Sequence, residues 1–521
     1  MKMLKSLLCG LLAAGLAASA NADTIVRIVG STAYRAGVHQ SILDYVSSSA
    51  FTGYSYVYWG NSNFRKAAGA VFTGTNSGGS KTIYETYWTG SAAGCTDLAI
   101  QKPIAAFLSG TYYDNAVASG TEVATAAGTG LTAETNITPP VFESPAQPAD
   151  VAMSDSLYSD VASGLKDANV SPALVISGTT YSNGVALKNA ILNNGLADAG
   201  DTSTSGTAPG DNGCVGIVAF EWVLGNPGST GLTGTSMGSQ VAEQLASTGA
   251  VNFSAISNNP NDLTNFALLV GRNEDSGTRI DSLAECGFEP AHSFDAAPVQ
   301  TYVLFSSTND VDTSYPTPTA SQGLYIGGPG VSATSVAIWS ANNALNTEPS
   351  VSWSPAGHSG YIAGGDVAAV LEATNGITYA GQTSSVRTLL NTLAPFNYGN
   401  APSASKIALI GYVGISDGHT ATGGGGIGLY YNGIPYNANY VENGSYTLWA
   451  YEHMYYLSSS AKKALINPIA DDLFTNNADI DSNGLHFTSS PSNSTGDSIG
   501  VPFLDMNVYR SFTEGGNLSS Y

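Results

Sequence analysis

The chain has 521 residues, 43% of them hydrophobic, and a formal net charge of −22. This length predicts more than one domain, and the apolar content excludes a disordered chain. The negative charge argues against binding to nucleic acid or to an anionic membrane. A small anion can still bind to local amide dipoles and one arginine, because surface charge is screened within about 10 Å.

The first 22 residues are typical of a secretory signal peptide. Lys2 and Lys5 precede a short apolar run, and the letters ANA at 20–22 form a small-x-small cleavage site. We therefore expect cleavage near Ala22 and export to the periplasm or the extracellular medium. No other stretch approaches the 18 apolar residues that predict a membrane span.

Three cysteines remain in the exported chain. Export favours one disulfide among Cys95, Cys214 and Cys286, and the sequence does not select the pair. Because there is no CxxC motif and no HExxH motif, we expect neither a metal nor another cofactor.

Strands alternate with helices along the chain, which predicts an α/β fold with parallel sheets. Residues 24–48 form the first strand, turn and helix, with apolar positions at helical spacing. Further strands are expected at 54–60, 81–94 (ending in a small-residue turn), 150–155, 215–226, 265–273, 406–416 and the first part of 446–474. Further helices are expected at 239–248, 276–286, 364–376 and the second part of 446–474.

Other segments read as irregular structure because they are rich in Gly, Ser, Thr and Pro. These are a loop-rich insertion at 108–150, a linker at 309–323, the letters HTATGGGG after the strand at 406–416, and about the last 45 residues.

Four small-residue turns follow predicted strands. They contain Gly30-Ser31-Thr32, the letters TGSAAG at 89–94, Met153-Ser154-Asp155, and Asp275-Ser276-Gly277-Thr278. A helix start offers unpaired N–H groups, Ser and Thr add hydroxyl donors, and Gly lets the backbone approach a ligand. Such turns suit phosphate-like oxyanions, although every α/β protein contains some of them.

The order of these motifs carries more weight than any one of them. The series VGSTAYRAGVHQSI, TGSAAG, AMSD, GIVAFEWVLGN, GRNEDSGTR, GYIAGGDVAAVLEATNG, IGYVGIS and VENGSYTLW resembles the phosphate-binding subunit of phosphate ABC transporters, and more widely the type II periplasmic binding proteins. The resemblance is scattered over most of 25–456, and the SGT segment is its most specific part.

The resemblance implies two α/β lobes joined by two crossing strands, near Val218–Val223 and Ile410–Val413, with the ligand between the lobes. One lobe would then comprise 23–218 and 414–521, and the other 219–413. Insertions at 108–150, 290–350 and 377–405 have no counterpart in that family and make this chain larger than its usual members.

The resemblance also implies the ligand-binding residues. These are the turn at Ser31, Thr32 and Ala33, then Ser91, Asp155 and Arg272, followed by Ser276, Gly277 and Thr278 at a helix start. Arg272 can make a two-pronged, charge-assisted contact with an oxyanion. Asp155 is an acceptor, so it would select hydrogen phosphate, which can donate a proton, over fully ionised sulfate.

Two departures from the family pattern leave the ligand open. Ala33 is followed by Tyr34 without the usual proline, and TGSAAG lacks the usual second glycine-serine pattern. The ligand could therefore be another oxyanion or a phosphorylated metabolite.

Structural interpretations stand beside the functional ones. Arg272 could pair with Glu274 or Asp275, Asp155 could cap the segment after it, and Ser91 could simply form a turn. Arg279 is expected at the surface or between the lobes.

Three further patterns favour structure over function. The letters GTSMG at 234–238 fit the hydrolase nucleophile motif, but the segment before them reads as loop. Residues 479–484 resemble the start of a calcium loop whose twelfth position is Ser490 instead of Glu. Trp449, Tyr451, Tyr455 and Tyr456 read as core.

The sequence thus favours an exported, monomeric solute-binding protein without enzymatic activity. It would capture phosphate or a related oxyanion and pass it to an ABC transporter permease. The alternative is a secreted or cell-surface protein that keeps the fold and uses its insertions for adhesion or assembly. A phosphatase or esterase ranks third, because no nucleophile or metal constellation supports it.

Overall fold

The structure is a computed structural model. It describes residues 23–61, 64–119, 137, 139–164, 169–199, 214–272, 276–287, 301–304, 323–326, 334–339, 364–372, 404–475, 500–501, 506–510 and 518–520. Several predictions fall outside the described residues. These concern the signal peptide, the segment 479–484, Glu274 and Asp275, and most of the insertions at 290–350 and 377–405.

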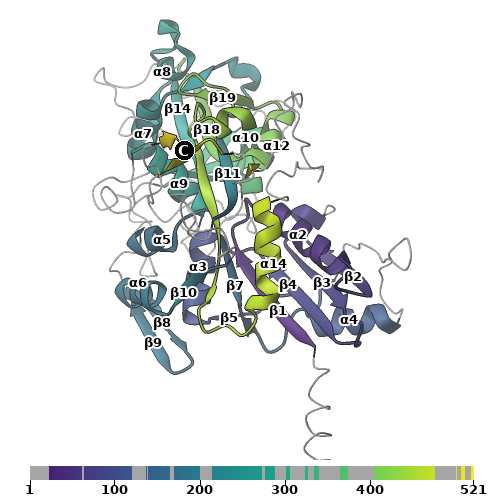
Figure 1. Cartoon of the computed structure of the whole chain (residues 1–521). Coiled ribbons are helices and arrows are strands. Elements are labelled where there is room, and N and C mark those ends of the chain that lie inside the picture. The colour runs from purple at the N-terminus through teal and green to yellow at the C-terminus, as the bar shows by residue number, and fades with distance from the viewer. Residues whose placement is uncertain are drawn as a thin grey trace, which may run out of the picture.

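The fold is α/β, as the sequence predicts, with helices on both faces of a large sheet (Figure 1). The prediction of parallel sheets is wrong in part, because strand pairs in this sheet are both parallel and antiparallel. Within the described residues, fourteen strands join in this sheet, whose main path runs β13-β14-β18-β11-β20-β7-β1-β4-β3-β2. These strands are β1 (Thr24–Gly30), β2 (Gly53–Trp59), β3 (Gly69–Thr75), β4 (Lys81–Tyr87), β7 (Val151–Ser154), β11 (Cys214–Leu224), β13 (Ala250–Asn252), β14 (Phe266–Val270), β18 (Ile407–Gly414) and β20 (Trp449–Leu457). Four short strands pair at its sides, namely β10 (Leu196–Asp198), β12 (Ser236–Met237), β19 (Ile427–Tyr431) and β21 (Gly500–Val501).

The longer helices are α2 (Arg35–Ser47), α3 (Ser91–Ile100), α4 (Gly110–Ser119), α5 (Tyr158–Gly164), α6 (Gly184–Asn193), α7 (Ser239–Thr248), α9 (Gly277–Glu285), α10 (Gly364–Glu372), α12 (Ile415–Gly423) and α14 (Lys463–Thr475). Shorter helices are α8 (Ser254–Ser257) and α13 (Ala438–Glu442). Separate small sheets pair β5 (Pro103–Ile104) with β6 (Gln147–Pro148), β8 (Asn169–Ile176) with β9 (Thr179–Asn183), β15 (Thr301–Leu304) and β16 (Gly323–Ile326) with β17 (Thr334–Trp339), and β22 (Val508–Arg510) with β23 (Leu518–Ser520).

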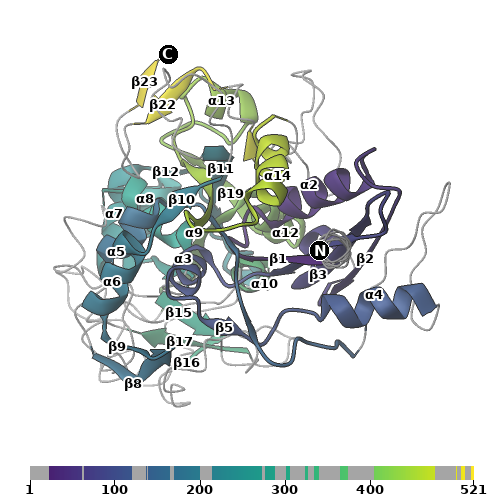
Figure 2. The same ribbon diagram turned by 60° about the horizontal axis from the view of Figure 1, so that its bottom comes forward.

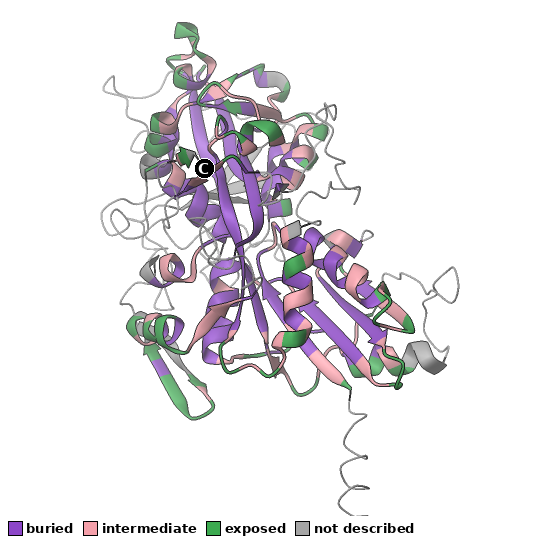
Figure 3. Ribbon diagram, viewed as in Figure 1, coloured by how far each residue is buried: buried purple, intermediate pink, exposed green. Residues whose placement is uncertain are grey.

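The elements gather into two halves, which Figure 1 shows one above the other. We call the part around β1, β4 and β7 the lower half, and the part around β14 and β18 the upper half. Strand β11 belongs to both, because Cys214–Ala219 pair with β20 and Phe220–Leu224 pair with β18. All eleven residues of β11 are buried (Figure 3). After β18, α12 and β19 pack against α10 and β11 of the upper half, and the predicted lobe boundaries stay a prediction.

The register of the sheet decides which strand ends face each other. Strand β1 is parallel to β4 and β7, and β14 is parallel to β18. Strand β20 is antiparallel to both β7 and β11, so β7 and β11 run the same way, from the lower half to the upper. Strand β18 runs antiparallel to β11, so it runs downward. The carboxyl ends of β1, β4 and β7 therefore face those of β14 and β18 where the halves meet.

Alternation along β1 builds the core of the lower half. Val26 and Ile28 point to one face and pack with Val38 and Ile42 of α2, whereas Val29 points to the other face and packs in the cluster that contains α3 and α6. Helix α14 lies beside α2, and α5 beside α6 (Figure 2). The sheet is thus covered on both sides, as a parallel sheet requires.

The described residues confirm most of the predicted elements, with four corrections. The predicted flexible tip at 419–426 is wrong in its first part, because α12 continues to Gly423. The predicted loop at 108–150 contains helix α4, and the small-residue turn TGSAAG contains the start of α3. The last 45 residues are not all irregular, since β21, β22 and β23 lie there.

The favoured disulfide does not form. Cys95, Cys214 and Cys286 are all buried thiols with no disulfide between them. Trp449, Tyr451, Tyr455 and Tyr456 are buried, which confirms that they belong to the core. In the part of the chain that is described, no helix has the length and apolar composition needed to cross a membrane.

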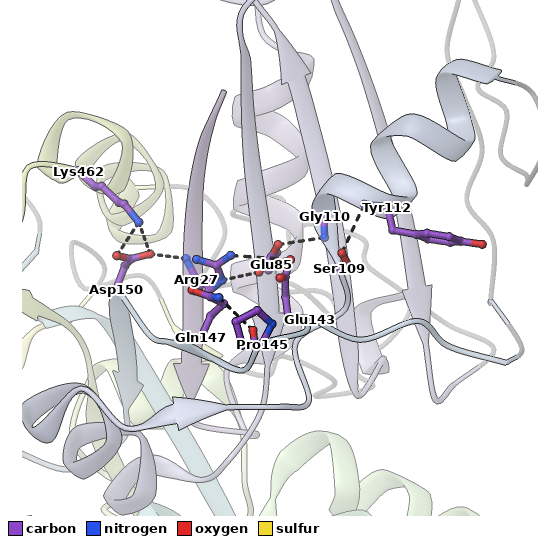
Figure 4. A network of polar contacts seen from close by, with 10 residues as sticks. All are labelled: Arg27, Glu85, Ser109, Gly110, Tyr112, Glu143, Pro145, Gln147, Asp150 and Lys462. Atoms are coloured by element: carbon purple, nitrogen blue, oxygen red, sulfur yellow. Dashed lines mark hydrogen bonds and ion pairs between the residues drawn. The ribbon is translucent and has the colours of Figure 1, made fainter. Parts of the chain in front are cut away.

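A polar network fastens the end of the predicted insertion to the lower sheet (Figure 4). Arg27 Nε lies 2.6 Å from Glu85 Oε2, and the N–H of Gly110, at the start of α4, donates to Glu85 Oε1 at 3.0 Å. The N–H of Arg27 donates to Asp150, whose carboxylate also pairs with Lys462 at 2.7 Å. The network ties β1, β4, α4 and the segment before β7 to the residues at the start of α14.

Glu85 is expected to make the stability of the protein fall as the pH rises. Burial raises the pKa of Glu85 from 4.5 to about 8, against the charge of Arg27. The folded chain thus keeps a proton that the unfolded chain releases, and this stabilisation is complete below pH 4.5 and is lost as the pH rises through about 8. We expect the free energy of unfolding to drop by a few kcal/mol over this window, at about 1.4 kcal/mol per pKa unit.

The measurement is urea unfolding at several pH values on the wild type and on Glu85→Gln. The variant is expected to show a flatter profile, because glutamine stays neutral. Some slope is expected to remain, because burial also raises the pKa of Glu221 to about 8. The control is Glu243→Gln, which makes the same substitution at an exposed position on α7. Identical pH profiles for Glu85→Gln and the wild type would contradict the prediction.

Candidate oxyanion site between the two halves

Five strand ends converge where the halves meet, and each leads into a turn or a helix start. The turn after β1 leads into α2, the turn after β4 into α3, and β7 ends at Ser154, next to Asp155. From the upper half, the segments after β14 and β18 lead into α9 and α12. The carboxyl ends of parallel strands are the usual place for a ligand in such sheets. Several helix N-termini, each with its positive dipole end, therefore lie in the same region.

The turn after β1 is shaped by Gly30, whose φ of 117° disfavours any residue with a side chain. The next N–H, that of Ser31, donates to Met153 O at 2.9 Å, so the turn is fixed to β7. The Ser31 hydroxyl is buried and has no hydrogen-bond partner among the described residues. Thr32 follows it and accepts from Arg272 Nη1 at 3.5 Å, and this contact crosses from the lower half to the upper half.

Asp155 lies at the centre of a second crossing contact. It accepts a hydrogen bond from Ser91 Oγ, at the start of α3, and one at 3.2 Å from Thr278 Oγ1 of the upper half. Burial raises the pKa of Asp155, while the hydrogen bond from Ser91 and the charge of Arg272 act in the opposite direction. A carboxylate has about four acceptor positions, so these two bonds leave capacity for a ligand proton.

Gly277 allows the halves to approach closely at this point. A Cβ at Gly277 would overlap Asp155 Oδ1 and would lie 2.6 Å from Ser91 Oγ. The preceding residue, Ser276, is the N-cap of α9, and its hydroxyl accepts from the N–H of Arg279 at 3.3 Å. The SGT segment thus supplies a cap, a close backbone approach and a hydroxyl donor in three consecutive residues.

Arg272 is buried among carboxylates of both halves. Its side chain is 2% exposed. Burial lowers the pKa of Arg272, and the charges of Asp417, Asp155 and Asp366 oppose that effect, in this order. A buried guanidinium that contacts Thr32, with the charge of Asp155 acting on its pKa, is placed to make charge-assisted bonds with an oxyanion.

A small pocket adjoins this group. Residues that line it include Thr32 and Ala33 of the first turn, Arg35 of α2, and Gly414, Ser416 and Asp417 of the α12 start. Its cavity volume is about 20 Å³, enough for one or two water-sized groups. An oxyanion such as phosphate is larger than this cavity, so the two halves would need to move slightly apart before it could enter.

All nine predicted site residues lie in this region, but sequence reasoning missed two charged residues beside them. Arg35 begins α2, one residue after Tyr34, and Asp417 lies in the first turn of α12. The letters AYR after the first turn could have indicated Arg35. Nothing near Asp417 could have indicated its position, because it depends on the pairing of β18 with β11.

Arg279 is not a surface residue. It is 1% exposed, and its Nη1 donates to the carbonyl oxygen of Arg272 at 2.6 Å. This bond joins the first turn of α9 to the backbone that carries Arg272, in the segment after β14. Arg279 therefore helps to fix the position of Arg272, the arginine of the candidate site.

The hydrolase motif has a structural explanation. Ser236 lies in the short strand β12, and its hydroxyl donates to Tyr430 O at 3.2 Å and accepts from the Gly433 N–H at 3.2 Å. These bonds fasten β12 to the β19 turn. None of the hydrogen bonds found for Ser236 joins it to a histidine or a carboxylate, which a serine nucleophile requires.

No family model and no curated protein matches the chain. Solved structures with some overall similarity include a phosphate ABC transporter substrate-binding protein with bound phosphate from Clostridium perfringens, at 10% identity over 87% of this chain and 96% of that one, with a TM-score of 0.32. They also include PstS from Borrelia burgdorferi (9% identity, 85% and 91% coverage, TM-score 0.28) and a phosphate-binding protein from Planctomyces limnophilus (8%, 87% and 89%, 0.29). At TM-scores near 0.3 these similarities carry no weight, so the functional argument depends on the geometry of the site.

Proposed function

We propose that the chain is an exported solute-binding protein of the type II periplasmic binding protein kind. It captures phosphate or a related oxyanion between its two halves and presents it to an ABC transporter permease, acting as a monomer and without catalysing a reaction. The observation that carries the proposal is the convergence of Thr32, Ser91, Asp155, Arg272 and Thr278, which come from separate parts of the chain to one buried junction.

These residues provide what a protonated oxyanion needs. Arg272 supplies a buried positive charge, the hydroxyl of Thr32 supplies a donor, and the helix starts supply N–H groups. The hydroxyls of Ser91 and Thr278 donate to Asp155, so they become donors to a ligand only when it replaces those bonds. Asp155 supplies an acceptor for the proton that the anion carries. Because the donors belong to both halves, a ligand that contacts all of them favours the closed arrangement.

A second candidate function is a non-transport role at the cell surface. It is favoured by the direct bonds between the halves, such as the bond that Ser156 Oγ donates to Asp281 Oδ1 at 2.8 Å. Absence of binding to any oxyanion would favour this candidate.

Asp155→Asn is expected to reverse the selectivity of the site. The amide can donate a hydrogen bond to fully ionised sulfate, whereas it no longer accepts the ligand proton from hydrogen phosphate as a carboxylate does. We expect phosphate affinity to fall about tenfold or more and sulfate affinity to rise, each by roughly the 1.5–3 kcal/mol of a charged hydrogen bond. The measurement is calorimetric titration with each anion after bound ligand has been removed.

The matched control is Asp281→Asn. Asp281 is also buried and also bonds to the other half, but it accepts from Ser156 instead of facing Arg272. Its substitution should leave the ratio of phosphate to sulfate affinity unchanged. An unchanged ratio in Asp155→Asn would exclude Asp155 as the selectivity residue.

A further inference from the structure

Asp417 lies near Arg35 and Arg272, the two positive groups that a bound anion would be expected to contact. It lines the same pocket as Thr32 and Arg35, at the first turn of α12. Its Oδ2 is packed against Gly364 so closely that a Cβ there would overlap it, and the same Cβ would lie 3.6 Å from Arg272 Nη1. The carboxylate of Asp417 and the guanidinium of Arg272 are therefore close neighbours.

Two arginines from opposite halves share this carboxylate. Asp417 is the charge with the largest effect on the pKa of Arg35 in the lower half and of Arg272 in the upper half, and in both cases it opposes the lowering by burial. The two arginines in turn repel each other, as the effect of Arg272 on the pKa of Arg35 shows. A negative charge close to both arginines offsets this repulsion and part of the cost of burying two guanidinium groups.

We infer that Asp417 is an internal counter-anion of the site, and that an entering oxyanion must share or take over its pairing with Arg35 and Arg272. This inference rests on the proposed oxyanion-binding function and names a residue that sets its affinity. Asp417 lowers the affinity for every anion, because its charge repels the ligand. The penalty is larger for a doubly charged anion than for a singly charged one, since the repulsion scales with the charge. The site is thereby biased toward oxyanions that carry a proton.

A simpler role for Asp417 is to stabilise helix α12, and the test must distinguish that role from the counter-anion role. An acidic residue in the first turn of a helix stabilises that helix through its dipole. If that were its whole contribution, replacing Asp417 would lower the melting temperature and leave anion affinity unchanged. A counter-anion role predicts the opposite for affinity.

The experiment is calorimetric titration of Asp417→Asn with phosphate and with sulfate at neutral pH. Asparagine keeps the size of the side chain and removes its charge. We expect affinity for both anions to rise by about tenfold, with the larger gain for sulfate. This pattern differs from that of Asp155→Asn, in which phosphate affinity falls while sulfate affinity rises.

Two controls make the result specific. Asp44→Asn removes one negative charge from the last turns of α2, about 13 Å along the helix from Arg35, and should change neither affinity. Asp366→Asn, whose charge acts on both arginines after that of Asp417, should give a smaller gain.

The outcomes distinguish this inference from the proposed function. If the wild type binds phosphate and Asp417→Asn binds both anions no more tightly, the counter-anion role is wrong and the proposed function stands. If Asp417→Asn alone binds an anion measurably, both are supported. If neither the wild type nor Asp417→Asn nor Asp155→Asn binds either anion, both are overturned together.

Discussion

Arg272→Ala is expected to abolish oxyanion binding, with affinity for phosphate reduced at least about a hundredfold. The guanidinium is the positive group that lies between Thr32 of the lower half and the carboxylates of Asp155, Asp366 and Asp417. Its removal leaves buried negative charges facing the ligand, so the loss includes both a lost attraction and a new repulsion. Calorimetric titration with phosphate measures the change.

The buried position of Arg272 means that the variant must also be tested for folding. Arg272→Lys keeps the charge but lacks the planar pair of donors, and we expect it to bind about tenfold more weakly than the wild type. Arg510→Ala is the control, because Arg510 is equally buried at 2% but pairs with Glu285 and does not line the pocket. Thermal melting should show folded protein for each variant. A folded Arg272→Ala protein that binds phosphate as the wild type does would overturn the assignment of the site.

Gly30→Ala is expected to lower the free energy of unfolding by about 3 kcal/mol or more. Gly30 has a φ of 117°, and a Cβ there would overlap the carbonyl oxygen of Met153 and lie 2.7 Å from its backbone nitrogen. The neighbour is a backbone in the centre of the sheet, so it cannot rotate away as a side chain would. Helix α3 also lies close to Gly30, because a Cβ at Gly94 of that helix would lie 2.7 Å from Gly30 Cα.

Urea unfolding of Gly30→Ala and Gly53→Ala measures this effect. Gly53 begins β2, has no atoms within 4 Å of its Cβ position, and has no positive φ. Its substitution should change the free energy of unfolding by less than about 1 kcal/mol. Equal stabilities for the two variants would show that the sheet adjusts easily at Gly30, contrary to the packing described above.

The sequence predicted the elements whose apolar pattern is strong and local. Strand β14 and helix α9 follow directly from the letters NFALLVGRN and SGTRIDSLAEC, because periodicity and the Ser276 cap agree. Helix α12 was missed because its letters, ISDGHTATG, are poor in helix formers. It forms because Ile415, Gly418 and Ala421 are buried against the upper half. At Gly418 a Cβ would overlap Glu221 of β11, a tertiary requirement that no local pattern reveals.

The residues of the candidate site show the same difference between what local sequence patterns indicate and what the tertiary fold determines. Thr32 and Asp155 could be proposed because each lies in a small-residue turn after a strand, and Arg272 because it precedes such a turn. The order of the turns also resembles a known family. Their actual meeting depends on which strand ends face each other, and that follows from the antiparallel pairing of β11 with β18 and β20. The place of Asp417 in the site also depends on the tertiary fold, since Arg35, which lines the same pocket, is nearly 400 residues away in the chain.

The sharing of β11 has a consequence for how the molecule unfolds. Its first six residues complete the sheet of the lower half, and its last five complete that of the upper half, without a linker between them. If either half melts, it removes backbone partners and apolar cover from the strand that borders the other half. The two halves are therefore coupled into one cooperative unit, and a partly denatured chain with one intact half is a poorly populated species.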